Sequence, residues 1–412
     1  MNTSNKLAFN LLVILVSTLV LLSACSSSDD ETQSQEQKDV VITIGNLSDL
    51  TGVAANAMEL IDMALEDLVT YFNQENLIPG VELEVITYDG QYDPARDISG
   101  YEWLRERGAD LIWTPAPPTA ATLKPRADKD QFMLFATAAN LDELMPAGYM
   151  FSVGTIPEFQ AYTLLDWLAY NDWDYTTNGP AKIGAAGWAD NYLRSLFDAA
   201  EEYADVHPDQ FEWVSGHLTD FGFTWGPEVN ALKDCDYIIV PNPMANFVKE
   251  YREMGYTAKF LGTDNHAAFL GMVTDAGLWD EIDGMLFIRS TKWWNEEGPI
   301  IDLTKNLLNR YHPSEAEATI SKGVGYIAMA NLYEVLTIVK DAVETVGPEK
   351  FDSQALYQAA QGFSLTIDEV ERFNFNETKR YSTNYYGVYM ADEASEDLIR
   401  LDPEWYHQLL EP

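Results

Sequence analysis

The stretch Val40-Val41-Ile42-Thr43-Ile44-Gly45 begins the pattern that decides the fold. A short β-branched run of this kind is typical of a strand that is buried on both faces of a sheet. Apolar residues then recur at the spacing of one helical face, at Leu60, Ile61, Ala64, Leu65, Leu68, Val69 and Phe72. The stretch therefore predicts a strand followed by a helix.

The same alternation repeats on both sides of residues 149–155. Further strands are expected at 81–85, 109–113, 132–135, 183–186, 211–214, 236–240 and 259–261, with helices between them. Repeated βα units with right-handed crossovers form parallel sheets covered on both faces, so we expect an α/β fold with two Rossmann-like lobes. After 284–288 the pattern changes to helices over 299–311, 326–346 and 353–361. The tail is expected to form a hairpin of 371–375 with 385–390.

The charge balance excludes several classes of partner. The chain has 66 Asp and Glu against 25 Lys and Arg, a formal net charge of −41. Nucleic acid needs a basic protein face, and anionic lipid attracts basic segments, so neither is expected as a direct partner. The hydrophobic fraction of 47% indicates a globular chain. The excess of acid fits a saline habitat or plain solubility, and both remain open.

The first residues resemble an export signal. Lys6 precedes an apolar run from Leu7 to Leu22, which is shorter than the roughly 20 residues of a spanning helix. The run ends in Leu22-Ser23-Ala24-Cys25, which resembles a bacterial lipobox. We therefore expect a lipoprotein signal peptide over 1–24, with lipid on Cys25; the alternative is an ordinary signal peptide. Residues 26–39 contain no apolar side chain, and 25–39 are expected to form a disordered acidic tether.

Motifs for catalysis and metal binding are missing. None of the five histidines has the spacing of a zinc site, and no nucleophile elbow or P-loop occurs. The segment 323–328 fits G-x-G-x-x-A but follows a polar stretch where that fingerprint needs a strand. Close helix packing is the simpler explanation of its glycines. Cys235 lies in an apolar run and is expected to be an inert core residue. We expect no metal, no cofactor and no enzyme activity.

A series of short motifs resembles a known family. The motifs occupy residues 44–52 (IGNLSDLTG), 88–94 (YDGQYDP), 190–192, 220–221, 255–256, 261–264 and 373–376. In order and spacing they resemble the type 1 periplasmic binding proteins of the branched-chain amino acid and amide class. These proteins are the substrate-binding components of ABC importers.

The resemblance implies two lobes joined by three crossovers, near Thr155, Ser290 and Phe373. Lobe one would comprise 40–155 plus 291–370, and lobe two would comprise 156–290 plus 371–412. The ligand would lie between the lobes, at the carboxyl ends of the strands. The lobes would close on it about a hinge.

The resemblance also implies ligand-binding positions. These are Ser48, Thr51, Trp113, Thr114, Thr119, Ala138, Asn140, Trp188, Tyr192, Asn242 and Asp264. Pro117-Pro118 replaces the family's usual serine pair and removes two N–H donors, which weakens carboxylate capture. Asp264 would take a ligand ammonium group. The alternatives are core packing for Trp113 and Trp188, packing at a helix start for Tyr192, and helix capping for Asp264. His266 is expected at the surface.

The combined expectation is an exported solute receptor. It would be lipid-anchored on the outer face of the cytoplasmic membrane or in the periplasm, and would deliver a small polar or amino-acid-like or amide-like ligand to ABC permease subunits. The prolines and tryptophans favour a more apolar ligand than a simple amino acid. A ligand-sensing receptor that signals to a separate membrane partner is the first alternative. An enzyme on the same two-lobed scaffold is the second.

Overall fold

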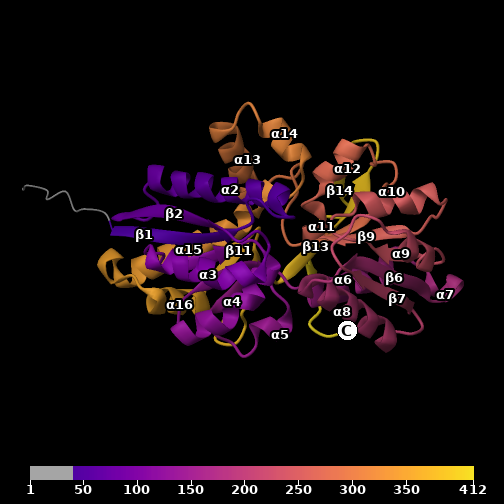
Figure 1. Ribbon diagram of the computed structural model, residues 1–412, viewed down its shortest axis with the longest axis horizontal. Helices are drawn as coiled ribbons and strands as arrows, with labels where there is room; N and C mark the ends of the chain where they lie inside the picture. Colours follow the sequence, from indigo (N-terminus) through magenta and orange to yellow (C-terminus); the bar gives the residue numbers. More distant parts are fainter. Residues whose placement is uncertain (1–39) are drawn as a thin grey trace, which may run out of the picture. The chain divides into compact units, whose positions relative to one another are not determined.

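The computed structural model describes residues 40–412 (Figure 1). Its first sheet is parallel throughout, in the order β2-β1-β3-β4-β5. The strands are β1 (Val40–Ser48), β2 (Val81–Asp89), β3 (Leu111–Thr114), β4 (Leu134–Ala138) and β5 (Met150–Thr155). Ile44 pairs with both Val85 and Leu111, so the order reverses at β1. The expected βα alternation is confirmed here.

Helices from two distant parts of the chain belong to this lobe. The early ones are α2 (Ala55–Gln74), α3 (Pro94–Glu106), α4 (Pro117–Asp130) and α5 (Leu141–Leu144). The later ones are α13 (Pro299–Tyr311), α14 (Ala316–Ser321), η1 (Gly325–Ala328), α15 (Met329–Val346), η2 (Pro348–Lys350) and α16 (Ser353–Gly362). Both α13 and α15 pack on α2, so the chain returns to the first sheet after building the second (Figure 1).

The second sheet follows the order β14-β13-β10-β9-β8-β6-β7. Its parallel strands are β6 (Ala181–Trp188), β7 (Phe211–Thr219), β8 (Tyr237–Ile239), β9 (Lys259–Thr263) and β10 (Leu286–Arg289). The antiparallel strands are β13 (Tyr385–Asp392), β14 (Asp397–Arg400) and the short β15 (Tyr406–His407), which pairs with β13. Its helices are α6 (Pro157–Asn171), α7 (Tyr175–Asn178), α8 (Asn191–Val206), α9 (Gly226–Ala231), α10 (Ala245–Glu253), α11 (Asp264–Ala267) and α12 (Leu270–Ala276). The sheet is therefore mixed: β6 to β10 are parallel, as the βα pattern predicts, and the tail adds antiparallel strands.

The tail is built differently from the hairpin that we expected. A tight turn at Asp368 and Glu369, both with positive φ, folds β12 (Val370–Asn374) back onto β11 (Ser364–Ile367). The other edge of β12 pairs antiparallel with the segment before β13. Phe373 bridges Thr383, the Asn374 N–H donates to the Ser382 carbonyl, and the Asn384 N–H donates to the Arg372 carbonyl. A hairpin around 376–380 is therefore present, but its second arm is 382–384; the predicted arm 385–390 belongs to β13, which pairs with β10.

The segment after β12 lies beside the first sheet. Ser152 of β5 donates from its N–H to the Arg380 carbonyl and accepts from the Ser382 N–H at 2.9 Å. These bonds favour a third crossover after Ser382, later than the position near Phe373 that the family resemblance implies. The division into lobes remains a proposal.

Two predictions about the core are confirmed. Cys235 is buried, and burial raises the pKa of its thiol to about 12, which keeps it unreactive. Gly325 lies where a Cβ would come within 2.7 Å of Leu60 Cβ, so this glycine allows η1 to pack closely on α2. Between residues 40 and 412, no helix is long and apolar enough to cross a membrane. Cys25, the signal peptide and the tether lie outside the described residues.

Candidate functional site

A pocket of about 960 Å³, part of it open to solvent, lies where loops from the two sheets meet. Most of its lining follows the carboxyl ends of parallel strands. Ala54 follows β1, Pro115 follows β3, Thr155 ends β5, Trp188 ends β6 and Asp264 follows β9. Ligands of open parallel sheets gather at such ends because neighbouring loops diverge there and leave a crevice. This pocket is therefore the candidate binding site.

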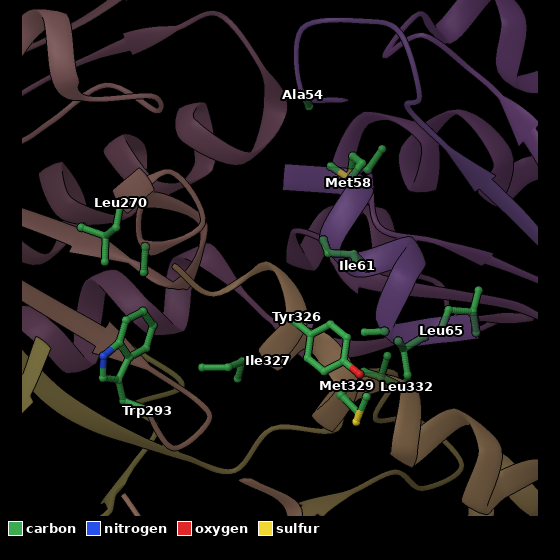
Figure 2. Close-up of a cluster of buried hydrophobic side chains, with 14 of the residues drawn as sticks. Ala54, Met58, Ile61, Leu65, Leu270, Trp293, Tyr326, Ile327, Met329 and Leu332 are labelled. Atoms are coloured by element: carbon green, nitrogen blue, oxygen red, sulfur yellow. The ribbon is translucent and has the colours of Figure 1, made fainter. Parts of the chain in front are cut away.

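One wall of the pocket is apolar and comes from the first lobe. Met58 and Ile61 lie one helical turn apart on α2, and Ile327 comes from η1 (Figure 2). All three side chains are at least 92% buried even though they line the pocket. Apolar side chains in a pocket favour binding of an apolar part of a ligand, because each Å² of apolar surface removed from water contributes roughly 25 cal/mol of free energy.

Trp188 lines the pocket from the second lobe and belongs to an aromatic cluster. Trp188 meets the rings of Phe221 and Phe223 edge-on, at centroid distances of 5.0 and 5.6 Å. Its indole Nε1 donates to the Gly222 carbonyl at 2.8 Å, which fixes the orientation of the ring. Phe221 and Phe223 are 58% and 56% exposed, so they extend the aromatic surface outward. Trp188 itself lines the pocket, as expected of a ligand contact.

Asp264 lines the pocket, but its carboxylate already has protein partners. Oδ1 lies 3.1 Å from Nη1 of Arg289, whose side chain is fully buried. Oδ2 accepts from the Ser290 N–H at 2.9 Å and from its hydroxyl at 3.3 Å. Burial raises the pKa of Asp264, and Arg289 opposes that rise. The carboxylate is therefore not free to serve only a ligand ammonium group. Asp264 is also the first residue of α11, and Thr263 is the cap.

His266 is buried, which corrects the surface position that we expected. Its Nδ1 accepts from the Thr263 N–H at 3.0 Å, so Nε2 carries the proton and donates to the Val240 carbonyl at 2.9 Å. Burial lowers the pKa of His266 to about 4 and keeps the ring neutral. The ring ties β9 to the end of β8 and holds Asp264 at the pocket.

Tyr192 is buried next to the pocket but outside its lining. It is 5% exposed, and its hydroxyl donates to Gln160 Oε1 at 2.5 Å and lies 3.1 Å from Thr263 Oγ1. It does not appear among the residues of 40–412 that line the pocket. Tyr192 was expected to point into one cleft with Asp264; instead it is bonded to the residue before Asp264. Asn242, after β8, does line the pocket.

The remaining predicted positions, all in the first lobe, lie outside the pocket lining. Trp113 is fully buried in the core and Ala138 is 1% exposed. Asn140 caps α5 and donates to Ser195 Oγ at 3.0 Å. Ser48 is buried at the end of β1, and the Thr51 hydroxyl donates to Asp89 at 2.7 Å. None of these side chains lines the pocket.

The loop after β3 offers few hydrogen-bond donors to the pocket. Three of its residues are prolines, Pro115, Pro117 and Pro118, and have no N–H. The Ala116 N–H donates to Thr114 Oγ1 at 3.2 Å. The Thr119 N–H donates to the Ala116 carbonyl, and its hydroxyl to Asp97 at 3.1 Å. The backbone N–H groups of Ala116 and Thr119 are therefore already used by the protein itself.

Several residues in or behind the pocket lining were not predicted. Arg289, which is buried behind Asp264 and outside the lining, was missed because an arginine that ends a strand gives no signal of burial. Ser290, Thr291 and Asn331 line the pocket, and Asn331 Nδ2 donates to the Val153 carbonyl. Polar residues after a strand and on a helix are common, so only the packing of lobe one against lobe two could identify them.

Metal binding finds no support in the described part of the chain. Residues 40–412 contain no group of three His, Cys, Asp or Glu side chains placed to hold a metal ion. The pocket is suited to binding a small organic molecule through apolar contacts and a few polar groups.

Comparison with known proteins gives one family and one fold. The profile of the family described as periplasmic binding protein matches residues 41–394. Among curated protein sequences, none is significantly similar to this chain. A branched-chain amino acid ABC transporter protein from Thermus thermophilus with bound valine is similar in structure, with 19% identity, a TM-score of 0.78 and coverage of 90% of this chain and 98% of that chain.

Two further solved structures share the fold. A fatty acid ABC transporter substrate-binding protein from Thermomonospora curvata has 18% identity and a TM-score of 0.75, over 90% of this chain and 93% of that chain. A solute-binding protein from R. palustris in complex with 4-hydroxybenzoate has 15% identity and a TM-score of 0.73, over 89% of this chain and 97% of that chain. At these identities the likeness shows the fold and not the ligand.

Proposed function

The chain belongs to the periplasmic binding protein family, and on that premise we propose that it is the solute-binding lipoprotein of an ABC importer. As a member of this family it is a binding protein and not an enzyme. In the proposed role it captures a small molecule between its two lobes by hinge closure and delivers it to permease subunits.

One observation carries the proposal: a single pocket draws its walls from both sheets. Met58 on α2 belongs to the first sheet's side, Trp188 ends a strand of the second, and Thr155 lies where the chain passes between them. A ligand held by all three would stabilise the closed arrangement, because the contacts to both lobes exist together only when the lobes are close.

The anchor and the location are further parts of the proposal. Leu22-Ser23-Ala24-Cys25 supports lipidation of Cys25, which would place the body outside the cytoplasmic membrane on a tether of residues 25–39. The family's description supports an extracytoplasmic location. A receptor that must meet membrane-bound permeases benefits from being held near them, because tethering raises the effective concentration.

A thermal-shift screen of purified protein against small metabolites tests the binding role. A ligand at a concentration 100 times its Kd adds about 2.7 kcal/mol of apparent stability and raises Tm measurably. Trp188→Ala should abolish the shift, because it removes an aromatic wall of the pocket. Trp103→Ala is the matched control, because Trp103 packs on Tyr88 and Arg107 outside the pocket. A hit whose shift survives Trp188→Ala and is lost in Trp103→Ala would contradict this site.

A further inference from the structure

We infer that the ligand has an apolar body and an amine or amide N–H donor, and that it carries no free carboxylate. This inference rests on the proposed function and specifies its substrate class. Three features of the pocket lead to it: a proline loop with few donors on the first lobe, a lining without cations, and an unpaired acceptor on the second lobe.

The first feature is the proline-rich loop that opens α4. Pro117 and Pro118 occupy the first turn of this helix, where free N–H groups would otherwise point towards an anion. Pro115 and Pro117 line the pocket directly. With the Ala116 and Thr119 N–H groups already bonded within the loop, a carboxylate placed here would lose its water without gaining donors. Such a loss costs several kcal/mol.

The second feature is the charge of the lining. Within the described chain, no Lys or Arg lines the pocket, whereas Asp190 and Asp264 do. The nearest guanidinium, that of Arg289, is fully buried behind Asp264 and paired with it. A ligand carboxylate would therefore meet acids without a free cation, and this arrangement repels an anion while it tolerates a cation.

The third feature is an unpaired acceptor on the second lobe. Asn242 Oδ1 is buried and makes no hydrogen bond to any residue of 40–412. Asp264 Oδ1 makes no hydrogen bond either, and its partner is the Arg289 guanidinium, 3.1 Å away in an ion pair. A buried acceptor without a partner is costly, so a ligand N–H that reaches Asn242 Oδ1 would be stabilised there.

The apolar wall of the pocket indicates that the ligand has an apolar body. Met58, Ile61, Ile327 and Trp188 offer side chains suited to an alkyl or aryl body. The donor end would face Asp264 and Asn242, and the body would face α2 and η1. An amino acid matches the body and the donor but brings a carboxylate, for which the proline loop has no free N–H and the lining between residues 40 and 412 has no cation.

Three compounds with one phenylalkyl skeleton separate these possibilities. Phenethylamine has the amine alone, 3-phenylpropanoate has the carboxylate alone, and phenylalanine has both. Titration calorimetry with wild-type protein should show phenethylamine binding at least about tenfold more tightly than either other compound, since each tenfold step corresponds to 1.4 kcal/mol. Phenylalanine or 3-phenylpropanoate binding as tightly as phenethylamine would overturn the inference, and so would failure of phenethylamine to bind at millimolar concentration.

A gain of binding tests the proline loop itself. The double variant Pro117→Ser/Pro118→Ser restores two N–H groups at the start of α4 and should bind phenylalanine about tenfold more tightly than wild type does. Pro125→Ser is the matched control, because Pro125 lies inside α4, exposed and outside the pocket lining, and should bring no gain. Equal affinities of the double variant and the control for phenylalanine would contradict the role of the prolines.

The outcomes also separate this inference from the proposed function. Tight binding of a carboxylate compound by wild type, lost in Trp188→Ala, would leave the binding role standing and remove only the ligand class. If no compound of any class in the metabolite screen raises Tm, the binding role itself is contradicted.

Discussion

The ion pair between Asp264 and Arg289 gives the sharpest prediction about stability. Asp264→Asn keeps the shape of the side chain and removes its charge, and leaves a guanidinium that is fully buried without a counter-ion. Breaking a buried pair in this way costs about 3–5 kcal/mol. We expect the lower end, because Arg289 also donates to Thr291 Oγ1 at 3.1 Å and lies 4.6 Å from the Trp293 ring centroid.

The expected loss converts to a measurable temperature. A body of roughly 370 residues unfolds with an entropy of about 0.8 kcal/mol/K, so about 3 kcal/mol lowers Tm by about 4 °C. Differential scanning calorimetry of the wild type and the variant measures this shift directly. Removing both charges in Asp264→Asn/Arg289→Met should recover much of it, because a well-packed apolar side chain replaces the unpaired cation.

An exposed ion pair provides the control. Lys340 and Glu344 lie one turn apart on α15 with side chains 36% and 53% exposed, and Glu344→Gln should change stability by less than about 0.5 kcal/mol. The reasoning fails if Asp264→Asn melts within 1 °C of wild type, or if the double variant is no more stable than the single one.

Three other changes test the parts around the pocket. Burial lowers the folded pKa of His266 from 6.5 to about 4, so its contribution to stability is complete above pH 6.5 and is lost as pH falls towards 4. In calorimetric melts over that range, wild type should lose about 3 kcal/mol more stability than His266→Gln does. Equal losses in the two proteins would contradict a neutral buried ring. Tyr192→Phe removes the hydrogen bond to Gln160 and should lower the free energy of unfolding by about 1–2 kcal/mol in the same assay. An unchanged Tm would mean that this hydrogen bond does not contribute to stability. Cys25→Ala should move the protein from the membrane fraction to the soluble fraction of cells, and an acylated, membrane-bound variant would refute the lipobox.

The sequence predicts the local parts of this fold well and the long-range parts poorly. The run at 40–45 is a strand, as expected, because β-branched residues ahead of a helical pattern leave little alternative, and 183–186 lies within β6. The β11–β12 hairpin was missed because its turn uses Asp368 and Glu369 in the left-handed region, without the glycine that usually marks such a turn.

The pocket was predicted in part. The family resemblance implied Trp188, Asn242 and Asp264, which line it, but also Ser48, Thr114 and Ala138, which end strands and do not line it. Tyr192 and Thr119 lie on helices, where packing decides which residues face a cleft, and neither lines the pocket. Arg289 meets Asp264 only because β9 and β10 pair with Ile288 beside Thr263, and no local pattern carries that register.

Small-angle X-ray scattering with and without a bound ligand tests the central claim most directly. The claim is that one ligand is held by walls from both lobes and draws them together about the crossovers. A saturating compound from the thermal-shift screen should reduce the radius of gyration of wild type and leave that of Trp188→Ala unchanged at the same concentration. Saturation of wild type by such a compound, proved by calorimetry, with an unchanged radius of gyration would contradict capture by lobe closure.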